Sequence, residues 1–468
     1  MNSYDYIIVG AGPAGLTLSL LLSNYKKKIA LIENKPYIGG CHGVKRVNGL
    51  FSEHGPRIYI DNYFSFKKIL KNIGTSFDEL FTKYNFGSSN VFNEVNANLS
   101  IKEMFTLFSC FICLNNSYKK ISLEEFMNNN NFSKRAKSFL ERVGKLTDGG
   151  DAKKYTLYNF LQIINQNLLY SIYQPKYPND QKLFKIWKDK LIDNGVDIFL
   201  DSHITNIEKY DKNITKIYIN NNIELTASNY ILAMPPYSIY SLIKQHDILT
   251  NSFGNNFDKW VDETNYITYI PVIFHWNTQL KIKKIWGMPK TEWGVGHIVL
   301  SDYIKFDDLR SQTVISTLIT SFEKSKYLNV TPNELSDKNI IIKEVFRQLK
   351  TIISDLPEPS YSIMSENYYD IELNKWMPIN SAFMTTKYGY INYKSQIYNN
   401  LYNCGVQNGN SLYSFTSLES SVQNSIELVH KLLPESKNDF TQKNILTVRF
   451  ILLVIFIIFA YIVIYYLF

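Results

Sequence analysis

Three glycines and one carboxylate near the amino terminus have the types and spacing of a nucleotide site. Gly10, Gly12 and Gly15 form a GxGxxG pattern, and Glu33 follows them. The first glycine permits a tight turn, the second lets the backbone approach a pyrophosphate, and the third lets a helix pack closely on a strand. A carboxylate about 20 residues further on can accept hydrogen bonds from both hydroxyls of an adenosine ribose. These residues predict a site for a dinucleotide.

The segments around these residues are typical of a strand, a turn, a helix and a second strand. Residues 7–9 are an apolar run expected to form a buried strand, and residues 14–22 have the apolar spacing of a helix. Glu33 follows a second apolar run. A phosphate in this arrangement meets the helix N-terminus, where unpaired N–H groups and the helix dipole favour an anion.

A glycine pair, Gly39 and Gly40, follows Glu33 in the stretch LIENKPYIGGC. The pair lets the chain turn back close over the pyrophosphate, as a cofactor extending past the first βαβ unit would require. The alternative is a simple glycine turn without a ligand. Glu33 does not distinguish NAD from FAD, because both carry an adenosine ribose, and the glycine pair favours FAD.

The order of motifs along the chain resembles that of a flavoprotein superfamily. GxGxxG, Glu-x5-Gly-Gly and the Gly-Pro-Arg of residues 55–57 occur in this order and are similar to motifs of the amine oxidase, phytoene desaturase and protoporphyrinogen oxidase superfamily. The resemblance continues through residues 182–207, 227–236 and 400–433, which match a helix and strand, a returning strand and a closing motif. It covers nearly all of the chain except the C-terminal tail.

The resemblance implies an FAD-binding site. Ile204 would meet the adenine, Gly405 the second phosphate region, and Ser417 and Leu418 the pyrimidine edge of the flavin at a helix N-terminus. The alternative for the last pair is an ordinary capped surface helix. The full set of expected cofactor-binding residues is Gly10, Gly12, Pro13, Ala14, Gly15, Glu33, Asn34, Gly39, Gly40, Cys41, Gly55, Pro56, Arg57, Ile204, Ala233, Gly405, Val406, Ser417 and Leu418. Neither a catalytic residue nor a metal site is assigned.

Two residues depart from the superfamily pattern. Val406 stands where an Asp usually contacts the ribityl chain, so that contact is missing or falls to Gln407 or Asn408. Cys41 stands where an Arg usually follows the glycine pair. FAD binding is still expected, while its affinity and redox competence are in question. The FAD is expected to be non-covalent, because residues 380–389 contain no cysteine.

The expected fold class is α/β, with a discontinuous Rossmann-type FAD-binding domain, an α+β substrate domain and a C-terminal transmembrane helix. The FAD-binding domain comprises residues 1–85, 182–240 and 370–433, and the substrate domain comprises residues 86–181 and 241–369. Residues 434–449 form a linker to the transmembrane helix at 450–468. Within the substrate domain, residues 264–276 are expected to be β-rich, and residues 340–353 have helical spacing.

The substrate domain is dense in aromatic residues, which can line a pocket for an apolar or amine substrate or simply pack a core. They are Tyr266, Tyr269, Phe274, Trp276, Trp286 and Trp293. Lys290 is able to reach the flavin N5 through a water or to lie solvated in a loop. His275 and His297 lie singly on apolar strands, as hydrogen-bonded core histidines do.

The two ends of the chain predict a membrane-anchored protein. The N-terminus lacks a signal peptide pattern, whereas residues 450–468 contain neither a charge nor an amide and would span about 28 Å as a helix. Lys437, Lys443 and Arg449 precede this run and fit the positive-inside rule, which places the body in the cytosol. The alternative is a terminal helix packed within the protein or an oligomer. Four cysteines in 468 residues fit a reducing compartment.

These features favour a membrane-tethered FAD oxidoreductase that transfers a hydride from a small or lipophilic substrate to flavin N5, with oxygen or a quinone-like compound as electron acceptor. Two alternatives stay open. One is a non-redox flavoenzyme similar to UDP-galactopyranose mutase, and the other is a membrane flavoprotein scaffold without turnover. The net charge of +8 is spread along the chain, so a nucleic-acid partner is not expected. The oligomeric state is not predicted.

Overall fold

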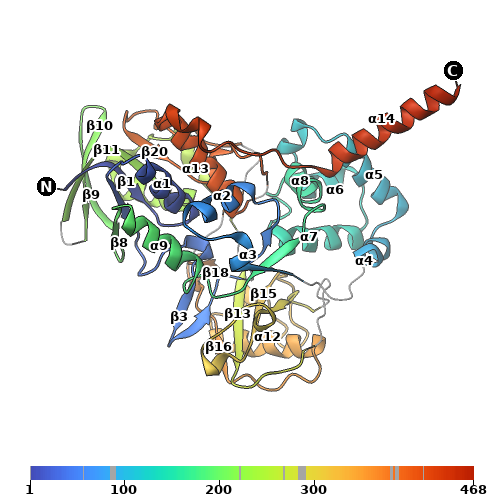
Figure 1. The fold of residues 1–468 in the computed structure, drawn as a ribbon. Helices are drawn as coiled ribbons and strands as arrows, with labels where there is room; N and C mark the ends of the chain where they lie inside the picture. Colours follow the sequence, from blue (N-terminus) through green and yellow to red (C-terminus); the bar gives the residue numbers. More distant parts are fainter. Residues whose placement is uncertain are drawn as a thin grey trace.

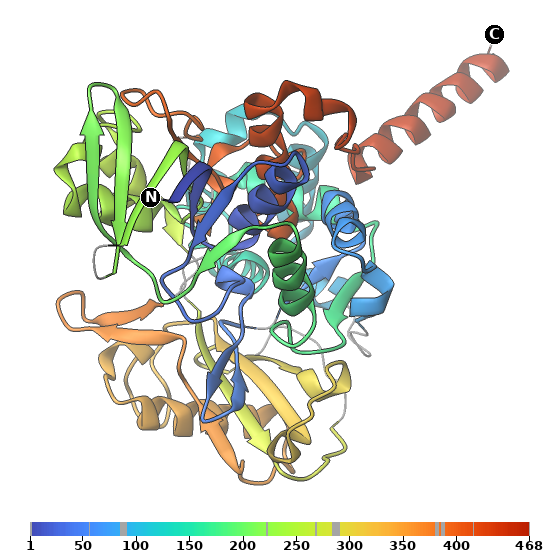
Figure 2. The ribbon, with the colours of Figure 1, turned by 60° about the vertical axis from the view of Figure 1, so that its left-hand side comes forward.

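The computed structural model of the chain describes residues 2–55, 57–84, 91–220, 223–266, 269–282, 291–379, 383–384, 389–414 and 416–467. Figure 1 shows a sheet-centred body, a helical body, a third body around a smaller sheet, and one helix that projects from the rest. Figure 2 shows the same projecting helix, α14 (Val448–Leu467), standing clear of the body from a second direction.

A seven-stranded sheet forms the first body, with strand order β8-β2-β1-β11-β10-β9 and β20 beside β11. β1 lies between β2 and β11 and is parallel to both, whereas β9, β10 and β11 pair antiparallel. β8 and β20 are parallel to their neighbours β2 and β11. The strands are β1 (Asn2–Val9), β2 (Ile29–Ile32), β8 (Asp197–Phe199), β9 (Ile204–Tyr210), β10 (Asn213–Ile219), β11 (Ile223–Leu232) and β20 (Leu401–Asn403).

Alternating side chains on β1 bury the sheet on both faces. Tyr6 and Ile8 pack with one set of helices, and Ile7 and Val9 pack with the opposite layer. The first layer contains α1 (Pro13–Asn24), α2 (Phe64–Asn72), α9 (Leu183–Asp193) and α13 (Leu418–Leu432), and the second contains α10 (Pro236–Gln245) and α11 (Phe257–Asp262). Segments far apart in sequence therefore share one core.

The other two bodies have cores of their own. The helical body has a core built from α5, α6, α7 and α8, and α4 lies against α7. A four-stranded sheet of order β14-β15-β13-β16 packs against α12. These elements are α4 (Val91–Asn98), α5 (Ile101–Ile112), α6 (Leu123–Asn129), α7 (Lys134–Asp148), α8 (Leu157–Asn167), β13 (Ile270–Trp276), β14 (Gly296–Val299), β15 (Thr313–Ile319), α12 (Lys338–Ile352) and β16 (Tyr361–Ile363).

Smaller sheets and one short helix join these bodies. β5, β6 and β7 form one sheet, and β3 pairs β4, β12 pairs β19 and β17 pairs β18. Their bounds are β3 (Lys45–Val47), β4 (Leu50–Ser52), β5 (Tyr59–Ile60), α3 (Phe77–Leu80), β6 (Phe81–Lys83), β12 (Asn265–Tyr266), β7 (Ile172–Pro175), β17 (Asn367–Asp370), β18 (Lys375–Pro378) and β19 (Phe383–Met384).

The local elements expected from the sequence are confirmed. The strand at residues 7–9, the helix at 14–22, the helix at 340–353 and the C-terminal helix correspond to β1, α1, α12 and α14. The Rossmann-like arrangement is confirmed by the parallel order of β8, β2, β1, β11 and β20. The division of the chain into an FAD-binding domain and a substrate domain stays a prediction.

Substitution of Gly15 tests the packing of α1 on β1. A Cβ added to Gly15 would lie 1.9 Å from the Gly10 carbonyl oxygen, so Gly15→Ala must displace helix or strand. We expect a loss of roughly 1–3 kcal/mol in the free energy of unfolding, the usual cost of overpacking, measured by urea denaturation.

Gly144→Ala in α7 is the matched control. Its added Cβ would find its nearest neighbour, a Tyr155 ring carbon, at an ordinary 3.5 Å. This variant should be neutral or gain up to about 1 kcal/mol from helix propensity. Equal stability of the Gly15→Ala variant and the parent protein would contradict the packing argument.

Candidate functional site

A cavity of about 920 Å³ lies where parallel strands of the large sheet end. Val9 ends β1, Ile32 ends β2, and Ala233 and Cys404 follow the last residues of β11 and β20; all four line the cavity. In open α/β sheets, ligands bind at this carboxyl edge. The same cavity extends to β14, β15 and α8, so one space connects the large sheet with the other two bodies.

The glycine loop brings the backbone to the cavity wall. Gly12 is the N-cap residue of α1, and no side chain of the described residues caps this helix end. Pro13, the first helical residue, has no N–H to satisfy. Gly12 and Gly40 face each other, since a Cβ on Gly40 would lie 3.0 Å from the Gly12 Cα. The loop and the helix N-terminus therefore present unobstructed backbone to an anionic group.

Glu33 holds the glycine loop from the end of β2. Its Oε2 accepts a hydrogen bond from the Ala11 N–H at 2.8 Å, and its Oε1 accepts one from the Lys35 N–H at 3.1 Å. Burial raises the pKa of the Glu33 carboxyl, and the Ala11 N–H and the Lys35 ammonium oppose this shift. Each oxygen keeps acceptor capacity for a ligand hydroxyl.

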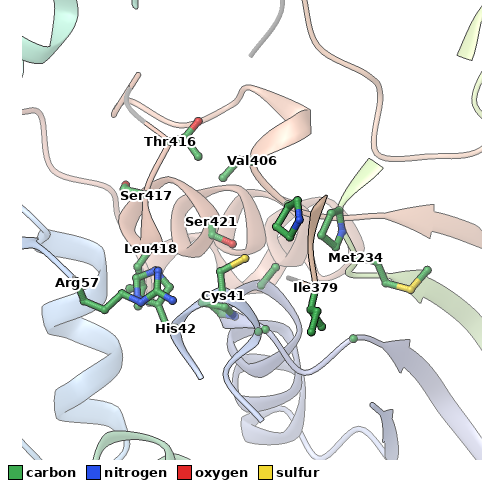
Figure 3. Close-up of a pocket in the computed structure, with 18 of the residues that line it drawn as sticks. Cys41, His42, Arg57, Met234, Ile379, Val406, Thr416, Ser417, Leu418 and Ser421 are labelled. Atoms are coloured by element: carbon green, nitrogen blue, oxygen red, sulfur yellow. The ribbon is translucent and has the colours of Figure 1, made fainter. Parts of the chain in front are cut away.

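The N-terminus of α13 meets the cavity as a second helix end. The Ser417 hydroxyl accepts a hydrogen bond from the Ser420 N–H at 3.1 Å, and Ser417, Leu418 and Ser421 line the cavity (Figure 3). Ser417 is the N-cap that the alternative expected, but α13 is not a surface helix at this end, because Leu418 and Glu419 are buried.

Glu419, unlike its neighbours on α13, binds another helix and not the cavity. Its carboxylate accepts hydrogen bonds from the Ser65 and Phe66 N–H groups at 2.9 and 2.8 Å. These groups lie in the first turn of α2, where negative charge is favoured. Glu419 therefore joins α13 to α2 and does not line the cavity.

Most of the residues predicted from the sequence meet in this cavity. Those that line it are Gly10, Gly12, Pro13, Ala14, Glu33, Asn34, Gly40, Cys41, Arg57, Ile204, Ala233, Gly405, Val406, Ser417 and Leu418.

Three predicted residues lie behind the wall instead. Gly15 packs on Gly10. Gly39 has φ +113° and packs against the Phe184 ring, and Gly55 lies beside Tyr269 and Leu318. These three residues are not among the described residues that line the cavity, and their contact with a cofactor stays a prediction. Pro56 lies outside the described residues.

The cationic groups of the described wall are Lys35 and Arg57. Burial lowers the pKa of Lys35, and Glu33 opposes that shift. Nε and Nη2 of Arg57 are buried and have no hydrogen-bond partner among the described residues (Figure 3). Burial raises the pKa of the Cys41 thiol, so Cys41 is neutral where the superfamily has an arginine. An anionic ligand would satisfy the guanidinium of Arg57.

Val406, the other departure from the superfamily pattern, has Gln407 beside it in the cavity wall. Its amide nitrogen donates to the Met234 carbonyl at 3.3 Å, and it lines the wall beside Val406. The Asn408 side chain is hydrogen-bonded within the protein. Its Oδ1 accepts from the Gly405 N–H, and its Nδ2 donates to Asn403 Oδ1 at 2.8 Å. Of the two candidates for a ribityl contact, only Gln407 lines the cavity.

The aromatic residues of the substrate domain are mostly core. Phe274, Trp276 and Trp293 are buried in the hydrophobic core of the four-stranded sheet, and Tyr266 packs on the core of the large sheet. Tyr269 does line the cavity. Trp286, Lys290 and most of residues 380–389 lie outside the described residues.

The two histidines have different environments. His275 is a core residue whose Nδ1 lies 2.9 Å from Ser311 Oγ and whose Nε2 lies 3.0 Å from the Phe51 carbonyl oxygen. His297 lines the cavity, so its assignment to the core was wrong. Burial lowers the pKa of His297 to about 4, and its imidazole is neutral near pH 7.

Several wall residues were not predicted from the sequence: Lys35, Ser202, Met234, Tyr237 and Ser421. Lys35 stands two positions after Glu33, and Ser421 lies one turn past Ser417, so helical and loop spacing offered a signal for both. Ser202 and Met234 lie within residues 182–207 and 227–236, so motif order offered a signal for them that spacing did not.

Comparison with known proteins agrees with this architecture. Residues 8–73 match the NAD(P)-binding Rossmann-like domain family. UDP-galactopyranose mutase of Mycoplasma genitalium is 37% identical over 65 residues, which are 13% of this chain and 16% of that enzyme. The chain thus matches only a small part of that relative, in the nucleotide-binding segment.

Similar solved structures extend over nearly the whole chain. Cyclohexylamine oxidase from Brevibacterium oxydans has a TM-score of 0.59 at 11% identity and covers 93% of this chain and 100% of its own. Putrescine oxidase bound to putrescine has a TM-score of 0.57 at 13% identity, with 92% and 99% covered. An oxidoreductase from Methanosarcina mazei has a TM-score of 0.58 at 13% identity, with 92% and 100% covered. The chain therefore shares its fold with these two amine oxidases and this oxidoreductase.

Acid titration tests the burial of His275. Burial lowers its pKa from 6.5 to about 4, so below pH 6.5 the unfolded chain binds a proton that the folded protein does not. This contribution to stability is complete above pH 6.5 and is lost as the pH falls toward 4, at roughly 1.4 kcal/mol per pH unit. His275→Gln should flatten the fall of unfolding free energy between pH 6.5 and 4, measured by urea denaturation.

The control is the difference in unfolding free energy between the two proteins well above pH 6.5, which should stay constant because His275 is neutral there in both the folded and the unfolded chain. Identical slopes for the His275→Gln variant and the parent protein would show that burial does not lower the pKa of His275.

Proposed function

We propose that the chain is a FAD-dependent oxidoreductase, tethered to a membrane by α14, that removes a hydride from a small or lipophilic substrate. The cavity at the carboxyl edge of the parallel strands carries this proposal. It joins the glycine loop, two helix N-termini and an apolar part in one space. This apolar part, lined by Ile163, Val295, Ile298 and Leu318, is called the far compartment below. The amine oxidase-like fold supports it.

The wall residues fit FAD along its length. Glu33 offers acceptors for the ribose, and the paired backbones of Gly12 and Gly40 leave room for a pyrophosphate. The unpartnered nitrogens of Arg57 and the ammonium of Lys35 supply positive charge in place of the arginine that Cys41 replaces. The N-terminus of α13 would favour negative charge on a flavin ring. FAD held here would supply hydride acceptance at N5.

The far compartment favours a lipophilic substrate over a charged amine. Ile163, Val295, Ile298 and Leu318 give it an apolar wall, and His297 is neutral. Among the described wall residues Glu33 is the one carboxylate, and it belongs to the β2 end. An alkylammonium group would therefore enter without a counter-charge, which is costly in an apolar pocket.

Substitution of Glu33 tests the cofactor site. Glu33→Ala removes an ionised acceptor whose hydrogen bonds are worth about 1.5–3 kcal/mol, so FAD affinity should fall roughly 10- to 100-fold. Glu33→Gln keeps the shape and should lose less. Apoprotein titrated with FAD, followed by flavin fluorescence, measures both.

Glu358→Ala is the matched control for charge, because Glu358 is exposed and is not one of the described wall residues. Unchanged FAD affinity in the Glu33→Ala variant would place the adenosine elsewhere.

Anaerobic reduction tests the reaction. Detergent-purified protein with FAD bound should lose its flavin absorbance when mixed with a lipophilic hydride donor such as a polyene or porphyrinogen, and less readily with small primary amines. Rapid bleaching by amines alone would contradict the reading of the apolar compartment. Failure of all donors, with FAD bound, would favour a flavoprotein scaffold without turnover.

A second candidate is a non-redox sugar-nucleotide mutase. The N-terminal identity with two mycoplasma UDP-galactopyranose mutases favours it, over 65 and 61 residues. In that case NADPH would reduce the flavin and UDP-galactopyranose would then isomerise without further consumption of NADPH. The apolar far compartment argues for the oxidoreductase, because a sugar diphosphate requires polar partners there.

A further inference from the structure

Helix α5 carries a stripe of large apolar side chains that the protein leaves uncovered. Ile101, Phe105, Phe108 and Ile112 are 82%, 71%, 54% and 41% exposed. Their spacing places all four within about 60° of arc on one side of a helix. Contiguous exposed apolar surface of this kind marks an interaction site.

The rotation of α5 is fixed, so the stripe cannot turn inward. Glu103 accepts hydrogen bonds from the Ser100 N–H at 2.7 Å and from the Ser133 N–H, before α7, at 2.6 Å. Phe111 lies in the core of the helical body. Because Glu103 and Phe111 hold the inner side, the stripe faces away from the protein.

The stripe is continuous with the base of α14. The Arg449 guanidinium donates to the Ile112 carbonyl oxygen at 2.9 Å, and the Arg449 N–H donates to Asn165 Oδ1 on α8 at 3.0 Å. Val448 and Leu452 pack on the same core as Phe111. Figure 1 shows α14 leaving the body beside α5 and α8.

If α14 crosses a bilayer, its first turn marks the height at which the bilayer boundary meets the protein. Among the described residues it is the one helix long and apolar enough to cross a membrane; its window Val448–Tyr466 has a mean hydropathy of 2.8, and none of that window is buried. Arg449 in its first turn is a charge that belongs at the water–lipid boundary. Since Arg449 reaches the end of α5, that end lies at the same level.

We propose that the exposed stripe of α5 lies in the interface of the bilayer that α14 enters, as a second, monotopic contact. Ile164, Leu168 and Leu169, at the end of α8, extend the surface and are 44%, 68% and 42% exposed. The occupant is lipid, because both apolar segments flank the entry point of a membrane span.

This placement deepens the proposed function, on whose membrane anchoring it rests. α8 has two sides: Ile163 and Asn167 line the cavity, and Ile164 and Leu168 belong to the membrane surface. One helix therefore separates the apolar compartment from the lipid, which suits a substrate that reaches the cavity from the bilayer.

Depth-dependent quenching tests the proposal with the full chain in phosphatidylcholine vesicles. A new cysteine replaces Phe105, Ile458 or Ile371 in a background with Cys110→Ser and Cys113→Ser, and each variant carries a bimane label. The labelled background, which keeps Cys41 and Cys404 in the cavity wall, serves as the blank and its emission is subtracted. Brominated acyl chains should cause on the order of a twofold loss of emission at position 105, because an interfacial helix places its apolar face about 5–10 Å into the bilayer.

The other two positions are the controls. A label at position 458, in α14, should be quenched. A label at position 371 should keep its emission, because Ile371 follows β17 and is 86% exposed.

Quenching at position 458 without quenching at position 105 would overturn the interfacial contact and leave the anchor in place. Energy transfer between labels at 105 on separate copies, without quenching, would assign the stripe to a second copy and likewise overturn it. No quenching at either position would overturn contact and anchor together. None of these readouts depends on flavin or turnover.

Discussion

The close approach of α1 to β1 is the constraint on which the site depends. Gly10 has φ +107°, and the position of Gly15 leaves no space for a side chain against its carbonyl. This contact aims the N-terminus of α1 at the cavity. α13 then packs along α1, where the Ser425 hydroxyl donates to the Ala14 carbonyl at 3.2 Å, and its own N-terminus arrives at the same cavity. Two helix dipoles thus converge because two helices pack on one another.

The parts of the fold and of the cavity that the sequence predicts are those whose contacts lie close together in the chain. The β1–α1–β2 unit, Glu33 and the glycine pair are encoded within about 40 residues, so spacing alone identified them. Ile204, Ala233, Gly405 and Ser417 were placed by resemblance of motif order, and they line the cavity because the strand order brings their loops to one edge.

The rest depends on tertiary packing that no local pattern records. His275 and His297 have the same sequence environment, yet one is fixed between Ser311 and Phe51 and the other faces the cavity. Trp276 and Trp293 are as apolar in sequence as wall residues and pack in a core instead. Gly39 was expected at the cofactor and faces the Phe184 ring, because α9 lies there.

The same packing connects the cavity with the exposed stripe of α5. α8 of the helical body lies between them, and the base of α14 is hydrogen-bonded to α8 and α5.

The most direct test is to identify the nucleotide that the cavity holds. Full-length protein purified in detergent is denatured, and the released chromophore is identified by mass spectrometry and absorbance. We expect FAD in amounts equimolar with the chain, and, because it is bound non-covalently, denaturation alone should release it. A colourless protein that releases no flavin and gains no thermal stability from added FAD would contradict it.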